Sequence, residues 1–453
     1  MKILRYIFFY FVALTIGGCG DILDTTPQQA ILEGTALNSS ANVKKTLKGA
    51  YNDLGSGDVY GGRMYLLPDL LGSENEVEYT GTQPPPQEIV QKNITVNNGF
   101  VTDLWLDSYE AINVANNVLS ALNVVNETDR DRVEGEAKFI RAIIYFQLVQ
   151  LFAKDYNDGN PSQNMGVPLT LSPARLISKD DHIPRNSVQQ VYEQIIKDLN
   201  KAKSKLNQQP PGYVYADTYA ASAFLGRVYL QKGAYELARN EANRVITEGP
   251  YSLAGNYADA FNHSSVNTSE DIFALQVSTQ DGNNALHGSY ASLDEAGSRS
   301  YSVAVTQQHI NLYKTGDSRS NLFYKDDNGN WHTGKWKNQY GNVNVIRLAE
   351  MYLIRAEANK RLNETIGATP TEDINTIRNR AGLEDAPRPV TLDDIFKERH
   401  RELAFEGHFL FDLKRKEGAI KGISWDAPRL VFPIPQRELD ANSELIQNEG
   451  YGE

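Results

Sequence analysis

One cysteine stands where a lipid could be attached. Cys19 is the only cysteine among 453 residues, and it follows two glycines at the end of the apolar run 7–16. Lys2 and Arg5 precede that run, which is too short to cross a bilayer, a task that needs about 20 apolar residues. This order is typical of a secretory signal peptide, and small residues directly before a cysteine are typical of a bacterial lipobox. We therefore predict that residues 1–18 are a signal peptide and that Cys19 is lipidated; the alternative is ordinary secretion with an incidental cysteine.

Aromatic side chains gather in a long polar segment, residues 251–344, which is rich in Ser, Asn and Gly. Flat rings stack on sugar faces while neighbouring polar groups bind hydroxyls, so the cluster favours a carbohydrate site. The alternative is that these rings pack beneath the loops. The members of the cluster are Tyr290, Tyr301, Tyr313, Tyr324, Trp331, Trp336 and Tyr340. Trp331 and Trp336 are the leading ligand-binding candidates, followed by Tyr290, Tyr301 and, from an earlier segment, Tyr79.

Enzyme motifs are missing from the sequence. It contains no Gly-x-Ser-x-Gly, no phosphate-binding loop of the Walker type and no His-Glu-x-x-His. Glycines at 55, 57, 61 and 62 do not have nucleotide-binding spacing, and they indicate a turn. Nothing points to the carboxylate pair of a glycosidase. We predict no catalytic residue and no enzyme activity.

Metal-binding patterns are also weak. His400 and His408 are eight positions apart, which indicates structural or solvent-facing roles rather than a ligand pair. Residues 326–330 place oxygen-bearing side chains at alternate positions, but the later glutamate of a calcium loop is missing, so a hairpin turn is favoured. We predict no cofactor and no metal ligand, and a structural calcium ion would have no support from the sequence.

The overall charge excludes one class of partner. The chain carries 45 basic and 57 acidic residues, a formal net charge of −12. Nucleic-acid binding requires clustered Lys and Arg that neutralise phosphates, so we predict no nucleic-acid partner.

Helical periodicity dominates the rest of the chain and predicts a mainly α fold. The predicted helices span residues 43–54, 105–125, 132–152, 187–206, 217–232, 235–247, 345–362, 371–381 and 392–406. Asn186 or Ser187 is the expected N-cap of the fourth helix. Within the fifth and sixth helices, Gly226, Tyr229 and Ala238 have the offsets of a tetratricopeptide repeat. Small residues there allow two antiparallel helices to approach closely.

A single such repeat cannot bury its apolar face alone, so we predict about four stacked helix pairs. The first helix would pair with the second, the third with the fourth, the fifth with the sixth, and 345–362 with 371–381. Two segments interrupt this pattern, 58–103 and 251–344, and are expected to be functional loops. In the second, residues 272–277 indicate a strand, and Asn328-Gly329 indicates a β-hairpin.

Several motifs, taken together and in order, resemble the SusD/RagB family of nutrient-binding outer-membrane lipoproteins. They are residues 19–24 with Pro27, residues 105–119, 135–149, 352–358, 374–382, 398–407 with 411–415, 432–435 with Glu438 and Leu439, and 447–451. The resemblance extends over nearly the whole chain after residue 18, which we treat as one SusD-like unit, 19–453, with halves 19–250 and 251–453.

The resemblance implies tetratricopeptide-like helix pairs with binding loops on one face and no catalysis. It also implies a lipid-anchored protein on the outer membrane that faces the exterior and passes an oligosaccharide to a SusC-like TonB-dependent transporter. The matching motifs belong to the scaffold, so the resemblance transfers no ligand residue. Alternatives are a peptide-binding member of the family, a lipoprotein glycoside hydrolase and a purely structural surface protein. Within the motifs, we expect Glu398 to pair with Arg401, and Glu136 to satisfy Arg141 or a neighbouring residue.

Overall fold

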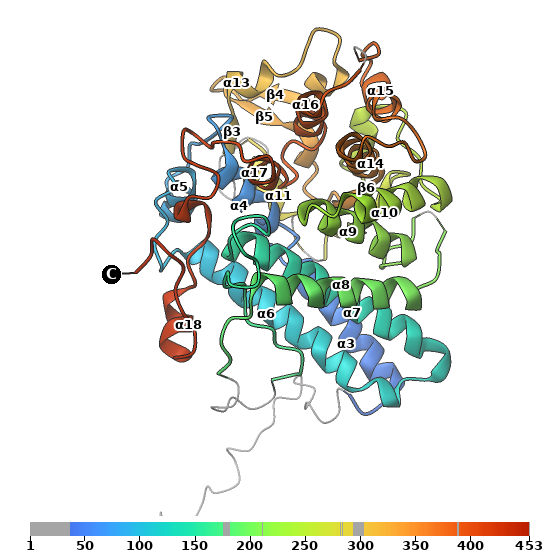
Figure 1. Ribbon diagram of the computed structural model, residues 1–453, viewed down its shortest axis with the longest axis vertical. Helices are drawn as coiled ribbons and strands as arrows, with labels where there is room; N and C mark the ends of the chain where they lie inside the picture. The colour runs from blue at the N-terminus through green and yellow to red at the C-terminus, as the bar shows by residue number, and fades with distance from the viewer. Residues whose placement is uncertain are drawn as a thin grey trace, which may run out of the picture.

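The computed structural model describes residues 37–174, 182–210, 212–280, 282, 284–292, 303–386 and 389–452. Successive helices pack on one another through the molecule, and Figure 1 shows them below and to the right of the small sheets. The main scaffold helices are α3 (Ser40–Leu54), α6 (Gly99–Ser120), α7 (Glu127–Phe152), α8 (Val188–Lys205), α9 (Thr218–Gln231), α10 (Tyr235–Glu248), α14 (Leu348–Leu362) and α15 (Pro370–Arg380).

The four predicted helix pairs are confirmed. Helix α3 packs on α6, α7 on α8, α9 on α10, and α14 on α15, while α8 contacts α9 and α10 contacts α14. A methyl group added at Gly226 would lie 3.6 Å from the carbonyl oxygen of Ala238, so α9 and α10 do approach closely at these small residues. Ser187 is the N-cap of α8, where its hydroxyl and the Gln190 side chain form a capping box.

Several predicted helix boundaries were wrong. Helix α6 begins six residues before the predicted residue 105 and ends five residues before 125, and α7 begins five residues before 132. Two further differences lie in the C-terminal half. Residues 345–347 belong to β6 (Val343–Arg347), because this β-branched segment pairs with β2 (Asp271–Leu275), and Arg347 then caps α14. Helix α16 (Leu392–Glu402) ends before residue 406. Phe405 and Gly407 take φ values of 61° and 75°, and this left-handed backbone ends the helix.

The segment 58–103, expected to be a loop, contains two further helices, α4 (Arg63–Gly72) and α5 (Pro84–Val90). The three prolines at 84–86 occupy the first turn of α5, where backbone N–H groups have no helical partner and proline is tolerated. The shorter helices of the remaining chain are α11 (Ala285–Tyr290), α13 (Gln307–Ile310), α17 (Phe409–Arg415) and α18 (Gln436–Ala441).

The second segment contributes most strands of two small antiparallel sheets, and β1 comes from the first segment. One has the strand order β1 (Val77–Tyr79), β3 (Val303–Val305), β5 (Trp331–Thr333) and β4 (Phe323–Lys325), and the other pairs β2 with β6. The predicted hairpin is confirmed: β4 and β5 are adjacent, and the carboxylate of Asp326 accepts hydrogen bonds from the backbone N–H groups of Asn328 and Asn330.

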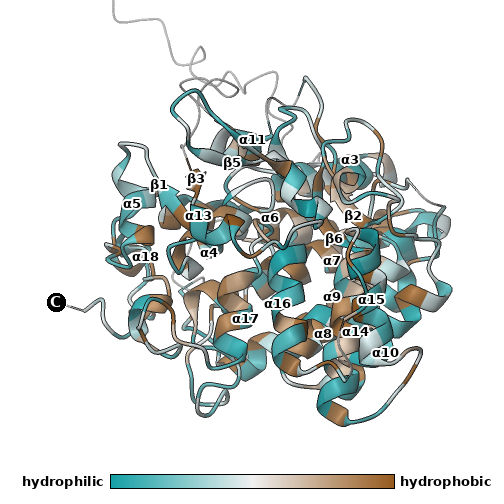
Figure 2. Ribbon diagram, turned by 90° about the horizontal axis from the view of Figure 1, so that it is seen from above, coloured by the Kyte–Doolittle hydropathy of each residue, from teal (hydrophilic) through white to brown (hydrophobic). Residues whose placement is uncertain are grey.

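Outer helices of the C-terminal half are strongly polar. In Figure 2 the ribbons of α15 and α16 are largely hydrophilic, whereas their apolar residues Ile374, Ile377 and Ile395 are buried in a common core. Among the helices that the structure describes, none combines the length and the apolar character needed to cross a membrane.

Candidate ligand-binding site

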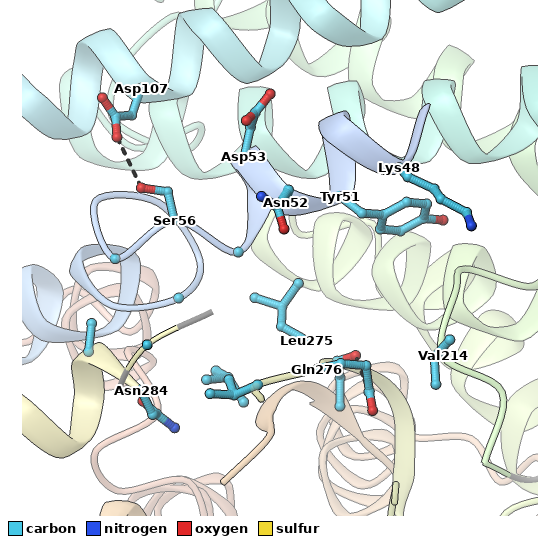
Figure 3. Close-up of a pocket in the computed structure, with 18 of the residues that line it drawn as sticks. Lys48, Tyr51, Asn52, Asp53, Ser56, Asp107, Val214, Leu275, Gln276 and Asn284 are labelled. Atoms are coloured by element: carbon cyan, nitrogen blue, oxygen red, sulfur yellow. Dashed lines mark hydrogen bonds between the residues drawn. The ribbon is translucent and has the colours of Figure 1, made fainter. Parts of the chain in front are cut away.

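A cavity of about 800 Å³ opens where the end of α3 meets the end of β2. Its size lies within the range of about 300–1,000 Å³ that is usual for ligand pockets. Figure 3 shows that its lining comes from α3 and the loop after it, from α6, and from the segments around Val214 and Gln276. Residues far apart in the sequence therefore share one concave surface.

Aromatic rings form one side of this cavity. The ring centroids of Tyr51 and Tyr215 are 5.0 Å apart with an angle of 56° between the planes, and Phe273 lies 6.2 Å from Tyr51. Phe273 is buried beneath them, and the hydroxyl of Tyr51 accepts a hydrogen bond from the backbone N–H of Ala216. Both rings are half-buried. These contacts fix Tyr51, whereas Tyr215 can present a face to a ligand.

Acidic side chains also line the cavity. Asp53, at the end of α3, lies near Asp107 and Glu110 of α6, and the hydroxyl of Ser56 donates to Asp107 Oδ2 at 3.0 Å (Figure 3). Burial raises the pKa of Asp53 to about 6, and the nearby carboxylates of Glu110 and Asp107 raise it further in the same direction. These side chains can accept several hydrogen bonds.

The amides around the cavity divide into fixed and exposed groups. Asn284 is fixed, because its amide donates to the carbonyl of Gly341 and its oxygen accepts from the N–H of Leu286 at the start of α11. Gln276 is fixed in the same way by Asn267. Asn52 and Gln280, in contrast, are exposed at the cavity.

A second cavity of about 520 Å³ adjoins the first and shares Lys48, Tyr51 and Tyr215 with it. It is lined by cations as well, with Lys44 paired to Asp129 and Arg132 paired to Glu136. The shared tyrosines thus lie between an acidic cavity and a more basic one. An elongated molecule could contact both.

Two aromatic residues proposed from the sequence are buried, and we correct their assignment as ligand contacts. Trp336 is 2% exposed, and its indole N–H donates to the carbonyl of Phe405 at 3.0 Å. Tyr290 is 0% exposed and donates to Asp69 Oδ2 at 2.6 Å. Tyr290 ends α11 and Trp336 lies in a 3-10 helix at 334–336, and both rings are packed in the core, so neither presents a face to a ligand in this structure.

The other candidates lie elsewhere. Tyr79 is buried in β1, where its hydroxyl accepts from the N–H of Gln83. Trp331 in β5 is half-buried, and the ammonium of Lys325 lies 4.7 Å from its ring centre. None of the four described rings lines either cavity. Cys19 and Tyr301 lie outside the described residues.

Sequence reasoning missed the tyrosines of the cavity. Tyr51 lies within the first predicted helix, 43–54, and Tyr215 lies outside the predicted helices; neither was among the ligand-binding candidates. The available signal was the pattern Tyr213-Val214-Tyr215 after the Pro-Pro-Gly sequence at 210–212, because alternating aromatic residues outside any predicted helix have no core to fill.

The sequence matches known families in both halves. Residues 21–230 match a SusD-like family described as "Starch-binding associating with outer membrane", and residues 323–429 match the SusD family. SusD-like protein P25 of Formosa agariphila is 24% identical over the full length of both proteins. The starch-binding protein SusD of Bacteroides thetaiotaomicron is 35% identical over 122 residues, which are 24% of this chain and 21% of that protein.

The fold also matches solved structures. A SusD superfamily protein from Bacteroides vulgatus superposes with a TM-score of 0.80 at 25% identity, covering 92% of this chain and 100% of that protein.

Proposed function

Because this chain belongs to the SusD/RagB family, we propose that it binds an oligosaccharide at the bacterial outer membrane. The observation that carries the proposal is the cavity lined both by Tyr51 and Tyr215 and by the acidic side chains of Asp53, Asp107 and Glu110. Aromatic rings and hydrogen-bond acceptors in one cavity match a sugar, whose ring has apolar faces and a rim of hydroxyl donors.

The proposed ligand is a glycan of several units. The second cavity continues from the shared tyrosines, so one chain of sugars could contact Tyr215 while its ends lie in different cavities. Trp331 remains a proposed secondary contact. Of the four ligand-binding candidates among the described residues, it is half-buried and the other three are buried. The starch-binding description of the matching family supports a carbohydrate over a peptide.

We further propose that Cys19 carries the lipid anchor, that the protein faces the cell exterior, and that it delivers the glycan to a SusC-like TonB-dependent transporter. The apolar run before Cys19 supports the anchor, and the family membership supports the location and the partner. In this mechanism the protein captures the sugar without cleaving it, and the transporter moves it across the membrane.

The test is calorimetry of the purified chain against a panel of oligosaccharides and peptides, followed by chromatography of the same mixtures. Binding of one glycan class with unchanged chain length supports the proposal. Shortened products would establish a glycoside hydrolase instead, binding of peptides alone would establish a peptide-binding member, and no binding at all would favour a structural protein. Co-purification with a β-barrel partner from mild detergent tests the transporter.

A further inference from the structure

Three side chains from distant segments converge away from the sugar cavity. Glu76 precedes β1, His309 lies in α13 and His400 lies in α16, three segments that meet at the upper end of Figure 1. Glu76 Oε2 lies 2.6 Å from His309 Nδ1 and 2.7 Å from His400 Nε2. Among the described residues this is the one group of three potential metal ligands whose donor atoms all lie within 4.8 Å of one another.

The cluster is buried except on the side of His400, which is partly exposed. Glu76 is 8% exposed and His309 is 1% exposed, whereas the side chain of His400 is 14% exposed. The ring of His400 lies against Phe409, with centroids 3.7 Å apart and planes inclined by 32°, and this contact orients Nε2 toward Glu76. An ion could therefore enter from the side of His400 and meet donor atoms that are already held in place.

The hydrogen bonds of Tyr313 bear on what lies between Glu76 and His309. The hydroxyl of Tyr313 has one hydrogen, and its oxygen lies 3.1 Å from the carbonyl oxygen of Arg401. The same hydroxyl oxygen is 3.3 Å from His309 Nε2, so when Tyr313 donates to Arg401 the ring supplies Nε2–H to the second contact. With its hydrogen on Nε2, a neutral His309 turns the lone pair of Nδ1 toward the carboxylate of Glu76, and two acceptors then face each other.

His400 lacks a second partner of its own. Its Nδ1 is buried and makes no hydrogen bond to any described residue, so the ring's one polar contact is with Glu76. The two imidazoles and the carboxylate therefore aim their donor atoms at one point. Metal-bound histidines usually donate the other ring N–H to a neighbour, and His309 does so to Tyr313.

We propose that Glu76 Oε2, His309 Nδ1 and His400 Nε2 form a binding site for a divalent transition-metal ion, with zinc as the ion that fits best. Two imidazoles and a carboxylate form a zinc ligand set, whereas calcium and magnesium take oxygen ligands. Zinc at about 2.0–2.1 Å from each atom requires the N···O contacts to widen to about 3.3 Å, a movement that side-chain rotation supplies. The fourth position is open toward solvent for a water molecule. Bound zinc would join three segments that are far apart in the sequence.

The test is calorimetric titration of the full chain, produced without a histidine tag, with zinc and with calcium. We expect one equivalent of zinc, no calcium at this site, and at least tenfold weaker zinc binding for Glu76→Gln and for His400→Gln. His263→Gln is the matched control, because His263 is exposed and lies outside the cluster, and its zinc affinity should equal that of the unchanged chain. Circular dichroism of each metal-free variant verifies folding.

A second measurement does not depend on any variant. Cobalt bound to the unchanged chain should give the intense visible absorption of a four-coordinate site, and zinc should displace it. The proposal is overturned if the unchanged chain binds no zinc, if both cluster variants bind zinc as tightly as the control does, or if cobalt shows only the weak absorption of an aqueous ion. Any of these results would mean that a proton occupies the space between Glu76 and His309.

Discussion

Arg347 and Glu402 form an almost completely buried ion pair, with Arg347 Nη1 2.6 Å from Glu402 Oε1. The same carboxylate also contacts Arg319 and Arg380. One acidic side chain at the end of α16 therefore contacts three guanidinium groups from different segments of the C-terminal half. These groups also pair with the carboxylates of Asp317, Glu398, Glu270 and Glu406. The network links β6, the end of α15 and the loop around Arg319 to α16.

We expect Glu402→Ala to lower the free energy of unfolding by about 3–5 kcal/mol, because it removes a buried carboxylate that Arg319, Arg347 and Arg380 share. The matched control on the same helix is Lys397→Ala. Lys397 pairs with Asp393 at 2.6 Å, but both side chains are 59% exposed, and such surface pairs contribute at most about 1 kcal/mol. Urea unfolding of both variants measures the difference. Equal losses would show that the buried network contributes no more than a surface pair.

The same carboxylate makes stability depend on pH. Burial alone would raise its pKa, but Arg380, Arg347 and Arg319 outweigh burial and hold the pKa of Glu402 well below its usual value. The stabilisation should therefore be complete above the unfolded-state pKa of about 4.3 and decline as the pH falls further. Glu402→Gln should flatten this acid limb of the stability curve.

Tyr290 is expected to stabilise the fold rather than bind a ligand. Its hydroxyl donates to Asp69 Oδ2, and the backbone N–H of Gly407 donates to the other oxygen. Burial raises the pKa of Asp69 to about 7 despite these two hydrogen bonds. We expect Tyr290→Phe to cost about 1–3 kcal/mol of stability and to raise the pKa of Asp69 further, because a buried acceptor loses its donor. Glycan affinity should not change, and a large loss of affinity in a folded variant would contradict this assignment.

The outcome for the aromatic residues shows what the sequence could predict. Helical periodicity located the scaffold helices, and Asn328-Gly329 located the hairpin, because both signals depend on neighbours a few positions away. Tyr51 and Tyr215 are far apart in the sequence and come together only through tertiary packing, so the local pattern around Tyr215 could not reveal its partner. Trp336 shows the opposite error, because the sequence proposed it as a ligand contact and it is buried. Its polar sequence surroundings suggested exposure, but the carbonyl of Phe405 satisfies its N–H inside the core.

Tyr215 and Trp331 give opposing predictions for the sugar site. We expect Tyr215→Ala to weaken glycan binding by about 1–3 kcal/mol, which is roughly tenfold to a hundredfold, because the ring of Tyr215 lies at the junction of the two cavities. Trp331→Ala should have a smaller effect, since that ring lies outside both cavities. Calorimetry with the glycan selected from the panel measures both. The reverse order of effects would place the site at the β4–β5 hairpin.

Asp53 should make glycan binding depend on pH. Because its pKa is about 6, the side chain is an ionised acceptor at neutral pH and becomes protonated in mild acid. An ionised carboxylate makes the stronger hydrogen bond to a sugar hydroxyl. We therefore expect affinity to fall between about pH 7.5 and about pH 5, and Asp53→Asn to remove most of that dependence. An unchanged pH profile in Asp53→Asn would show that Asp53 does not contact the sugar.

The lipid anchor is the remaining prediction, and it rests on the sequence alone. Cys19 follows a short apolar run and two glycines, and the chain has no other cysteine to which a thioether-linked lipid could be attached. We expect cells given a labelled fatty acid to incorporate label into the unchanged protein but not into Cys19→Ala. The variant should also leave the membrane fraction while keeping the glycan affinity of the unchanged chain, because residue 19 precedes the folded scaffold. Equal labelling of the two proteins would rule out Cys19 as the attachment site, whereas loss of label together with loss of glycan binding would show that the anchor region contributes to the fold.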